Sequence, residues 1–338
     1  MPGIVFSEAS GLNDTLFGKV QGPVQEIILS KAKSMEERAT AIDRLFKKTT
    51  STHFGETYAE LTSMDGFMPT PENGALNIAG MQEGFKKFLQ NVNWTNSFRI
   101  SRNMIDDTDV ISLKERPEAF IASYYTTRER FAAALVGGAL SGNSTVSFGR
   151  MSFDATAADG LSLFNAAHKS AVDSDYTQSN ICSNTLTATN LGLVETAHQN
   201  LKDDNGMSLR IAPGTIVIPN TAKAKADAFK AIGSDKDPET SNNAFNYQVG
   251  RWNILVWQEL NDFVTTSATA YPWFLIDEDY NQNFGSLILQ ERQALEVDSY
   301  EDKNTYANIW RGFSRFTGGF KDWRGVFAGG ISTAAALS

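Results

Sequence analysis

Residue types that build chemical sites or covalent frameworks are scarce in this chain of 338 residues, which has one cysteine and three histidines. The lone cysteine, Cys182, cannot form an internal disulfide, and the scattered histidines leave no cluster of metal ligands at a usual spacing. The fold must therefore be held by packing or by contacts with other copies of the chain. We predict no catalytic, cofactor-binding or metal-binding residues and no cofactor.

Long apolar runs and excess positive charge are missing as well. No run reaches the roughly 18 apolar residues that suggest a membrane span. The first eight residues lack the basic start and apolar block of a signal peptide, so we expect no membrane partner and no export by that route. Acidic residues outnumber basic ones by 39 to 30, a net charge of −9. This balance argues against a protein that grips nucleic acid, although an acidic surface can still face it.

The most regular stretch, residues 112–142, predicts a long helix. Side chains recur there at steps of three and four, which places them on one helical face: Phe120, Ile121, Tyr124, Tyr125, Arg128, Phe131, Ala132, Leu135 and Ala139. At about 1.5 Å per residue, a helix over 117–142 would span roughly 39 Å. Such a helix would form the spine of a domain.

Both ends of this helix carry sequence signals. Ser112 and Glu115 have the spacing of a capping box, whereas Pro117 suits a first helical turn. The helix therefore begins either in a short turn at Ser112 or at Pro117. Its end is marked by Gly137-Gly138 and by Gly142.

The N-terminal part is expected to form an irregular arm over residues 1–23 and an amphipathic helix over 24–49. Ser34 and Glu37 have capping-box spacing in that second segment. Residues 52–91, rich in Gly and Pro, indicate an extended excursion whose return limb is a half-buried strand over 92–104. Because an isolated two-stranded ribbon is marginally stable, we expect it to rest on another subunit.

Two groups of residues invite a chemical interpretation, and each has a simpler structural one. Asp106, Asp107 and Asp109 have carboxylates that can ligate a hard cation, but acidic residues before a helix also favour its positive end. His168 beside Ser170 suggests nucleophilic catalysis. No serine lies in a G-x-S-x-G elbow, so we expect His168 to tie down a loop.

A second unit is expected from Leu186. It contains a helix over 191–201, a turn at 203–206, a buried strand at 215–219 and a helix over 221–232 packed through Ala222, Ala226, Phe229 and Ile232. Only one glycine, Gly214, lies near this strand, so the sequence does not indicate a glycine-rich loop whose backbone amides bind phosphate. A polar loop over 234–249 and short strands over 252–257, 272–276 and 286–290 follow. Their aromatic residues could stack on a sugar or base, or form strand cores. A final strand, broken at Gly318-Gly319, is expected to cross between two sheets.

The order of these parts resembles the major capsid protein of tailed bacteriophages, with its α+β, Hong-Kong-97-type fold, and most closely the major head subunit of Mu-like phages. The patterns that carry the resemblance are Ser101–Asp107, Leu163–His168, Leu209–Pro219 with its APGTIVIP run, Trp273–Asp277 and Phe320–Gly325. They extend over most of the chain.

The resemblance implies a division of the chain and a function. The expected parts are an N-terminal arm (1–51), an E-loop (52–105), a peripheral P-domain (106–185 and 303–322, with the spine helix at about 117–142) and an axial A-domain (186–302 and 323–338). Pentamers and hexamers would build an icosahedral shell around phage double-stranded DNA, without sequence-specific binding. A separate scaffolding protein, a portal and a cement protein are further expected partners. The resemblance implies that the protein is part of the virion and assembles in the bacterial host cytoplasm. It also implies that the protein has no enzymatic activity.

Some relatives join subunits through Lys-Asn isopeptide bonds. Lys86 and Lys87 lie in the loop that would carry the lysine, but two exposed lysines are ordinary, so we predict non-covalent assembly. The alternatives are an encapsulin-like compartment, a phage tail or baseplate protein, and a hydrolase that uses His168 or the aspartates near residue 107.

Overall fold

The computed structural model describes residues 5–6, 16–38, 40–61, 67–76, 78, 80, 83–107, 110–173, 175–233, 246–267 and 270–337. In chain order the elements are β1 (Val5–Phe6), α1 (Leu16–Glu36), α2 (Ala41–Leu45), β2 (Lys47–Thr50), β3 (Gly55–Leu61), β4 (Glu83–Gln90), β5 (Val92–Ser101), α3 (Arg102–Asp106), α4 (Val110–Leu140), β6 (Thr145–Phe148), β7 (Met151–Asp154), β8 (His168–Lys169), β9 (Thr177–Gln178), α5 (Ala188–Gln199), β10 (Thr215–Pro219), α6 (Ala222–Ile232), β11 (Asn253–Trp257), η1 (Glu259–Asp262), β12 (Trp273–Ile276), α7 (Glu278–Phe284), β13 (Leu287–Asp302), β14 (Ala307–Phe320), η2 (Trp323–Gly325) and β15 (Val326–Gly329).

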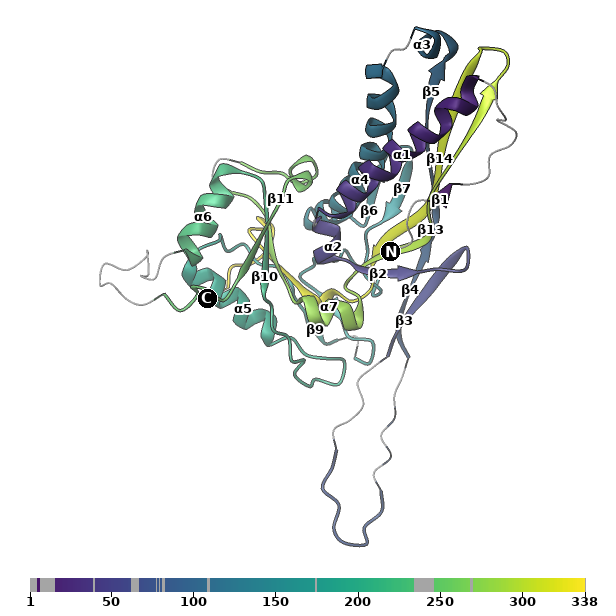
Figure 1. Ribbon diagram of the computed structural model, residues 1–338. Helices are drawn as coiled ribbons and strands as arrows, with labels where there is room; N and C mark the ends of the chain where they lie inside the picture. Colours follow the sequence, from purple (N-terminus) through teal and green to yellow (C-terminus); the bar gives the residue numbers. More distant parts are fainter. Residues whose placement is uncertain are drawn as a thin grey trace.

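One lobe of the molecule is elongated and is built on a five-stranded sheet, seen on the right of Figure 1. The long strands β13 and β14 pair antiparallel, and β5 lies antiparallel on the other side of β14. The short strands β1 and β2 pair with β13 in parallel at successive positions along it. Segments from both ends of the chain thus meet in one sheet.

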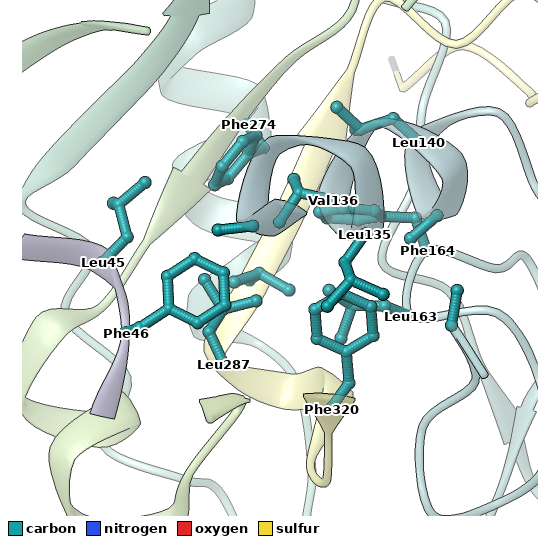
Figure 2. Close-up of a cluster of buried hydrophobic side chains, with 14 of the residues drawn as sticks. Leu45, Phe46, Leu135, Val136, Leu140, Leu163, Phe164, Phe274, Leu287 and Phe320 are labelled. Atoms are coloured by element: carbon teal, nitrogen blue, oxygen red, sulfur yellow. The ribbon is translucent and has the colours of Figure 1, made fainter. Parts of the chain in front are cut away.

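Helix α4 runs along this sheet and supplies much of the core. From Phe131 to Leu140 every residue is buried, including Ala133, Ala134 and Val136, which lie off the predicted face. Figure 2 shows why: the last turns of α4 are surrounded by side chains from several parts of the chain, among them Phe46, Phe164, Phe274 and Phe320. A helix that is apolar on all sides needs such a fully enclosed position.

The second lobe is built on a four-stranded sheet in the order β11-β10-β12-β15. Strands β10 and β11 are parallel and are joined through α6, while β12 and β15 are antiparallel to their neighbours. Ile216 and Ile218 pack with α5 and α6 on one face. Val217 and Ile276 join the core of α4 on the other face, so the two lobes share one hydrophobic core.

Strands β3 and β4 form an antiparallel hairpin that projects away from both lobes (Figure 1). The prediction of two paired strands that leave the body is confirmed, but the segment predicted as the second strand of the pair is wrong. Strand β4 is the partner of β3, whereas β5 pairs with β14 in the body, and Met104 lies in α3. The alternating pattern of β5 reflects burial against α4 and not a hairpin.

The predicted helix over 24–49 is three elements. Helix α1 begins earlier, at Leu16, so residues from there to 23 are not irregular, and it contains Ser34, which therefore is no N-cap. A true capping box, Thr40 with Asp43, restarts the chain as α2. Residues Lys47–Thr50 then form strand β2, because they pair with β13. This tertiary pairing overrides the helical periodicity of the sequence.

The spine helix is longer than either predicted start allows. Helix α4 begins at Val110, contains Ser112 and Pro117, and ends at Leu140. Its 31 residues span about 46 Å. Proline removes one backbone donor and crowds the preceding turn. The packing of α1 against this part of α4, through Val24 and Ile28, outweighs that local cost.

Two further expectations about the second half were partly wrong. In α6, Ile232 packs on the core as expected. The buried residues, however, are Ala224, Ala228 and Ala231, because small side chains let the helix approach its sheet closely, whereas Phe229 is 69% exposed. Strand β14 runs unbroken through Gly318-Gly319. The expected strand at 286–290 extends to Asp302 as β13. Of the polar loop, residues 234–245 lie outside the described part.

Candidate assembly surfaces

The connection between β3 and β4 exposes apolar side chains far from the body. Phe67, Met68, Leu76 and Ile78 are each at least 63% exposed. Between them, the chain turns at residues 71–74, where the Gly74 amide donates to the Pro71 carbonyl at 2.8 Å and Asn73 adopts φ +66°. Exposed apolar side chains that gather at a projecting tip mark a protein contact. These four residues are called the tip below.

The base of the hairpin is fixed to β13 by a buried amide. The Gln290 side chain is wholly buried and donates to the Leu89 carbonyl at 3.2 Å and to Asn91 Oδ1 at 2.9 Å, while its Oε1 accepts from the Tyr58 hydroxyl at 2.9 Å. A Cβ added at Gly319 would lie 2.4 Å from Leu89 Cδ2. Glycine here lets β14 and the hairpin approach each other closely.

A buried lysine forms the second anchor. Lys87 on β4 is 5% exposed, and its ammonium donates to Asp154 Oδ2 at 2.6 Å and to Thr156 Oγ1 at 2.8 Å. The ion pair and the Thr156 amide hold the pKa of Asp154 below its ordinary value although partial burial works against them. Lys87 thus ties the hairpin to the β6–β7 region.

A cluster around Arg324 forms the third anchor. The buried Arg324 guanidinium donates to Glu60 on β3 at 2.9 Å and to Asp204 at 2.9 Å, and lies 3.4 Å from Asp322. Asp322 in turn accepts from the Tyr280 hydroxyl at 2.6 Å. A cavity of about 230 Å³ adjoins these groups. They are called the Arg324 cluster below.

Burial and repulsion dominate the electrostatics of this cluster. Burial, followed by the charge of Asp322, raises the pKa of Glu60 to about 8, and the attraction of Arg324 only partly opposes them. Burial and Asp322 likewise raise the pKa of Tyr280. The raised pKa of Glu60 favours its protonated form near neutral pH.

The residues suggested by sequence as chemical sites are held in structural contacts. Asp106 lies 3.4 Å from Arg102, Asp107 is the C-cap residue of α3, and Asp109 lies outside the described residues. Among the described residues, no three His, Cys, Asp or Glu side chains converge to hold a metal ion. His168 is buried, with its ring nitrogens 2.6 Å from Asp159 and 3.2 Å from Asn180, so it does tie down a loop.

The other candidate residues also have structural surroundings. Ser170 donates to the Asp204 carbonyl at 3.3 Å. Trp257 and Trp273 are buried in strand cores, which is the simpler of the two interpretations given above. Lys86 pairs with Glu83 on the surface of the hairpin. Burial raises the pKa of the Cys182 thiol to about 11.

Sequence reasoning misses the anchors of the hairpin. Glu60, Asp204 and Arg324 are more than a hundred residues apart from one another, and no spacing rule connects them. Lys87 is expected from sequence to be exposed, yet it is buried, because buried and exposed residues alternate at this end of β4.

Comparison with known proteins identifies the body of the chain. Residues 91–329 match the family model described as phage capsid protein. The chain belongs to the phage capsid protein family. The match covers the region from β5 to β15, which includes α4, the whole four-stranded sheet and the three longest strands of the five-stranded sheet. No curated protein sequence matches the chain. This family is structural, and the protein is a major capsid protein, which forms the phage shell.

Solved capsids share the fold at low sequence identity. The capsid of Ralstonia phage GP4 matches with a TM-score of 0.54 and 10% identity over 87% of this chain and 89% of that one. The mature capsid of bacteriophage PhiM1 matches with a TM-score of 0.50 and 12% identity over 87% and 88%. The capsid of bacteriophage JBD30, decorated with minor capsid protein trimers, matches with a TM-score of 0.51 and 13% identity over 66% of this chain and 92% of that one. In the described part of this capsid protein, no helix is long and apolar enough to cross a membrane.

Proposed function

We propose that this capsid protein self-assembles through pentamers and hexamers into an icosahedral shell around double-stranded phage DNA, and that its hairpin reaches a neighbouring subunit. The observation that carries the proposal is the tip: Phe67, Met68, Leu76 and Ile78 are exposed at the end of an anchored, projecting hairpin. A second copy of the chain is the occupant that an assembling shell supplies at every such tip. Rings of this kind use head-to-tail contacts.

The domain map follows the one expected from sequence, with two boundaries moved. We assign residues 1–51 to the N-terminal arm, 52–91 to the E-loop, 92–185 and 287–322 to the P-domain, and 186–286 and 323–338 to the A-domain. Strand β5 moves into the P-domain because it pairs with β14. The pairing of β13 with β14 and β2 supports moving 287–302 into the P-domain as well. The spine helix is α4.

The charge of the chain fits a shell that holds DNA without gripping it. A net charge of −9 repels the polymer and leaves it mobile during packaging and ejection. A separate scaffolding protein, a portal and a decoration protein are the proposed partners, with assembly in the host cytoplasm. Decoration is recorded for the JBD30 capsid. The proposed relation to Mu-like head subunits depends on the sequence patterns quoted above.

Assembly is proposed to be non-covalent and without enzymatic activity. Lys87 is buried and paired with Asp154, so its side-chain nitrogen is not free to attack an amide. Lys86 is exposed and paired with Glu83. Boiled, denatured shells should run as a single band at about 37 kDa. A ladder of higher oligomers would contradict this. An encapsulin-like compartment is the alternative, and particles that hold protein and no DNA would favour it.

Sedimentation velocity tests the role of the tip. We expect Phe67→Ser/Ile78→Ser to remain folded, because both side chains are exposed, and to lose large assemblies. Phe229→Ser, which removes an exposed apolar side chain from α6, is the matched control and should assemble normally. Assembly of the tip variant at wild-type concentrations would contradict the proposal.

A further inference from the structure

The Arg324 cluster joins the hairpin to the body through groups that cannot all be charged without excess repulsion. The guanidinium of Arg324 and the nearby ammonium of Lys321 face the carboxyl groups of Glu60, Asp204 and Asp322. Two positive charges balance two carboxylates, and the third leaves an excess negative charge in a buried place. Asp203 also borders the cavity, but its Oδ1 accepts from the amides of its own turn at residues 205 and 207.

Two of the three carboxyl groups are held in place by other partners. Asp204 Oδ1 also accepts from the Ala171 amide at 3.0 Å. Asp322 accepts from the Arg324 amide at 3.0 Å and from the Tyr280 hydroxyl at 2.6 Å. For Glu60, the hydrogen-bond partner within the described residues is Arg324 alone. Glu60 is also the one member that belongs to the hairpin, so it is the group that can leave.

We propose that Glu60 is a proton-operated latch: the hairpin stays docked against the Arg324 cluster while this carboxyl group is protonated and separates from it when the group ionises. The adjoining cavity of about 230 Å³ gives the departing carboxylate room to regain water. The Asp154 carboxylate of the second anchor stays charged in the same range, because the pKa of Asp154 lies below its ordinary value. The hairpin would therefore pivot about β4 and not detach.

The direction of the pH dependence follows from linkage. The docked state has the higher Glu60 pKa and so binds the proton more tightly than the released state. Docking is strongest at low pH and weakens as the pH rises from about 4.5 to about 8. This latch belongs to the fold of a single chain, so it is tested separately from shell assembly.

Hydrogen–deuterium exchange on the full-length chain tests the latch, with labelling times scaled for the intrinsic pH dependence of exchange. Between pH 6 and pH 9, we expect protection in residues 55–61 and 200–209 to fall by about tenfold or more. Glu60→Gln cannot ionise but retains an acceptor for Arg324, so its protection should stay flat. Glu83→Gln, which changes an exposed carboxyl group on β4 of the same hairpin, is the matched control and should behave like the wild type.

Two results would overturn the latch: a flat wild-type profile, or a Glu60→Gln profile that falls as steeply as the wild type. A second measurement does not depend on any variant folding. In wild-type chain labelled with ¹³C at glutamate side chains, one carboxyl resonance should titrate well above pH 6. Titration of every glutamate near pH 4.5 would refute the proposal.

Discussion

Replacement of Phe131 by alanine tests whether α4 is the centre of the fold. Phe131 is wholly buried where α4 faces the five-stranded sheet. Its ring lies at centroid distances of 4.7 Å from Phe153, 5.2 Å from Trp94, 5.7 Å from Phe148 and 6.0 Å from Phe316. These rings come from four different strands, so a cavity at Phe131 weakens contacts throughout the elongated lobe.

The expected cost follows from transfer and cavity terms. Removing a buried phenylalanine side chain loses about 1.5–3 kcal/mol of transfer free energy. The cavity left among rigid rings brings the total to about 3–5 kcal/mol. The higher helix propensity of alanine offsets about 0.5 kcal/mol of this loss of stability. We therefore expect Phe131→Ala to lower the free energy of unfolding by about 3–4 kcal/mol.

Urea unfolding of the unassembled chain, followed by circular dichroism, measures this change. Phe229→Ala is the matched control, because it makes the same substitution in a helix at a side chain that is 69% exposed. It should change the free energy of unfolding by less than about 0.5 kcal/mol. A cost below about 1.5 kcal/mol for Phe131→Ala, or similar costs for both variants, would refute the reasoning.

Three further predictions concern single buried groups. Asp154→Ala should destabilise the chain more than Lys87→Met does, because it leaves a buried ammonium unpaired whereas a freed Asp154 stays hydrated; equal losses in urea unfolding would contradict this. Gly329→Ala should cost about 1–3 kcal/mol, since the added Cβ would lie 2.4 Å from the buried Trp273 ring, and an unchanged melting temperature would speak against such close packing. Burial lowers the pKa of His198 to about 4, so stability falls as the pH drops from about 6.5. Between pH 7 and pH 5, the free energy of unfolding of His198→Gln should fall by about 2 kcal/mol less than that of the wild type. Identical pH profiles for the two proteins would refute the lowered pKa of His198.

Much of the architecture could be predicted from sequence because local signals agreed with the tertiary structure. The buried strand at 215–219, the helices expected over 191–201 and 221–232 and the body of α4 all combine a regular pattern with a matching environment. The projecting excursion was also predictable, since its glycines and prolines exclude a packed element. The capsid family was likewise predictable, because the patterns that indicate it are spread along most of the chain.

The errors arose where a contact distant in sequence decided the local structure. Lys47–Thr50 carries a helical pattern but becomes a strand because β13 offers an open edge. Gly318-Gly319 is typical of a break, yet the strand continues because α4 and the hairpin need close approach there. The Arg324 cluster is the extreme case: its members come from β3, the turn after α5, α7 and the segment that begins η2, and only folding brings them together.

Cryo-electron microscopy of the purified chain tests the central claim most directly. The account predicts closed icosahedral shells, or rings of five and six subunits, in which the tip of each hairpin lies on a neighbouring subunit. A protein that stays monomeric at every concentration, with neither rings nor shells, would contradict it.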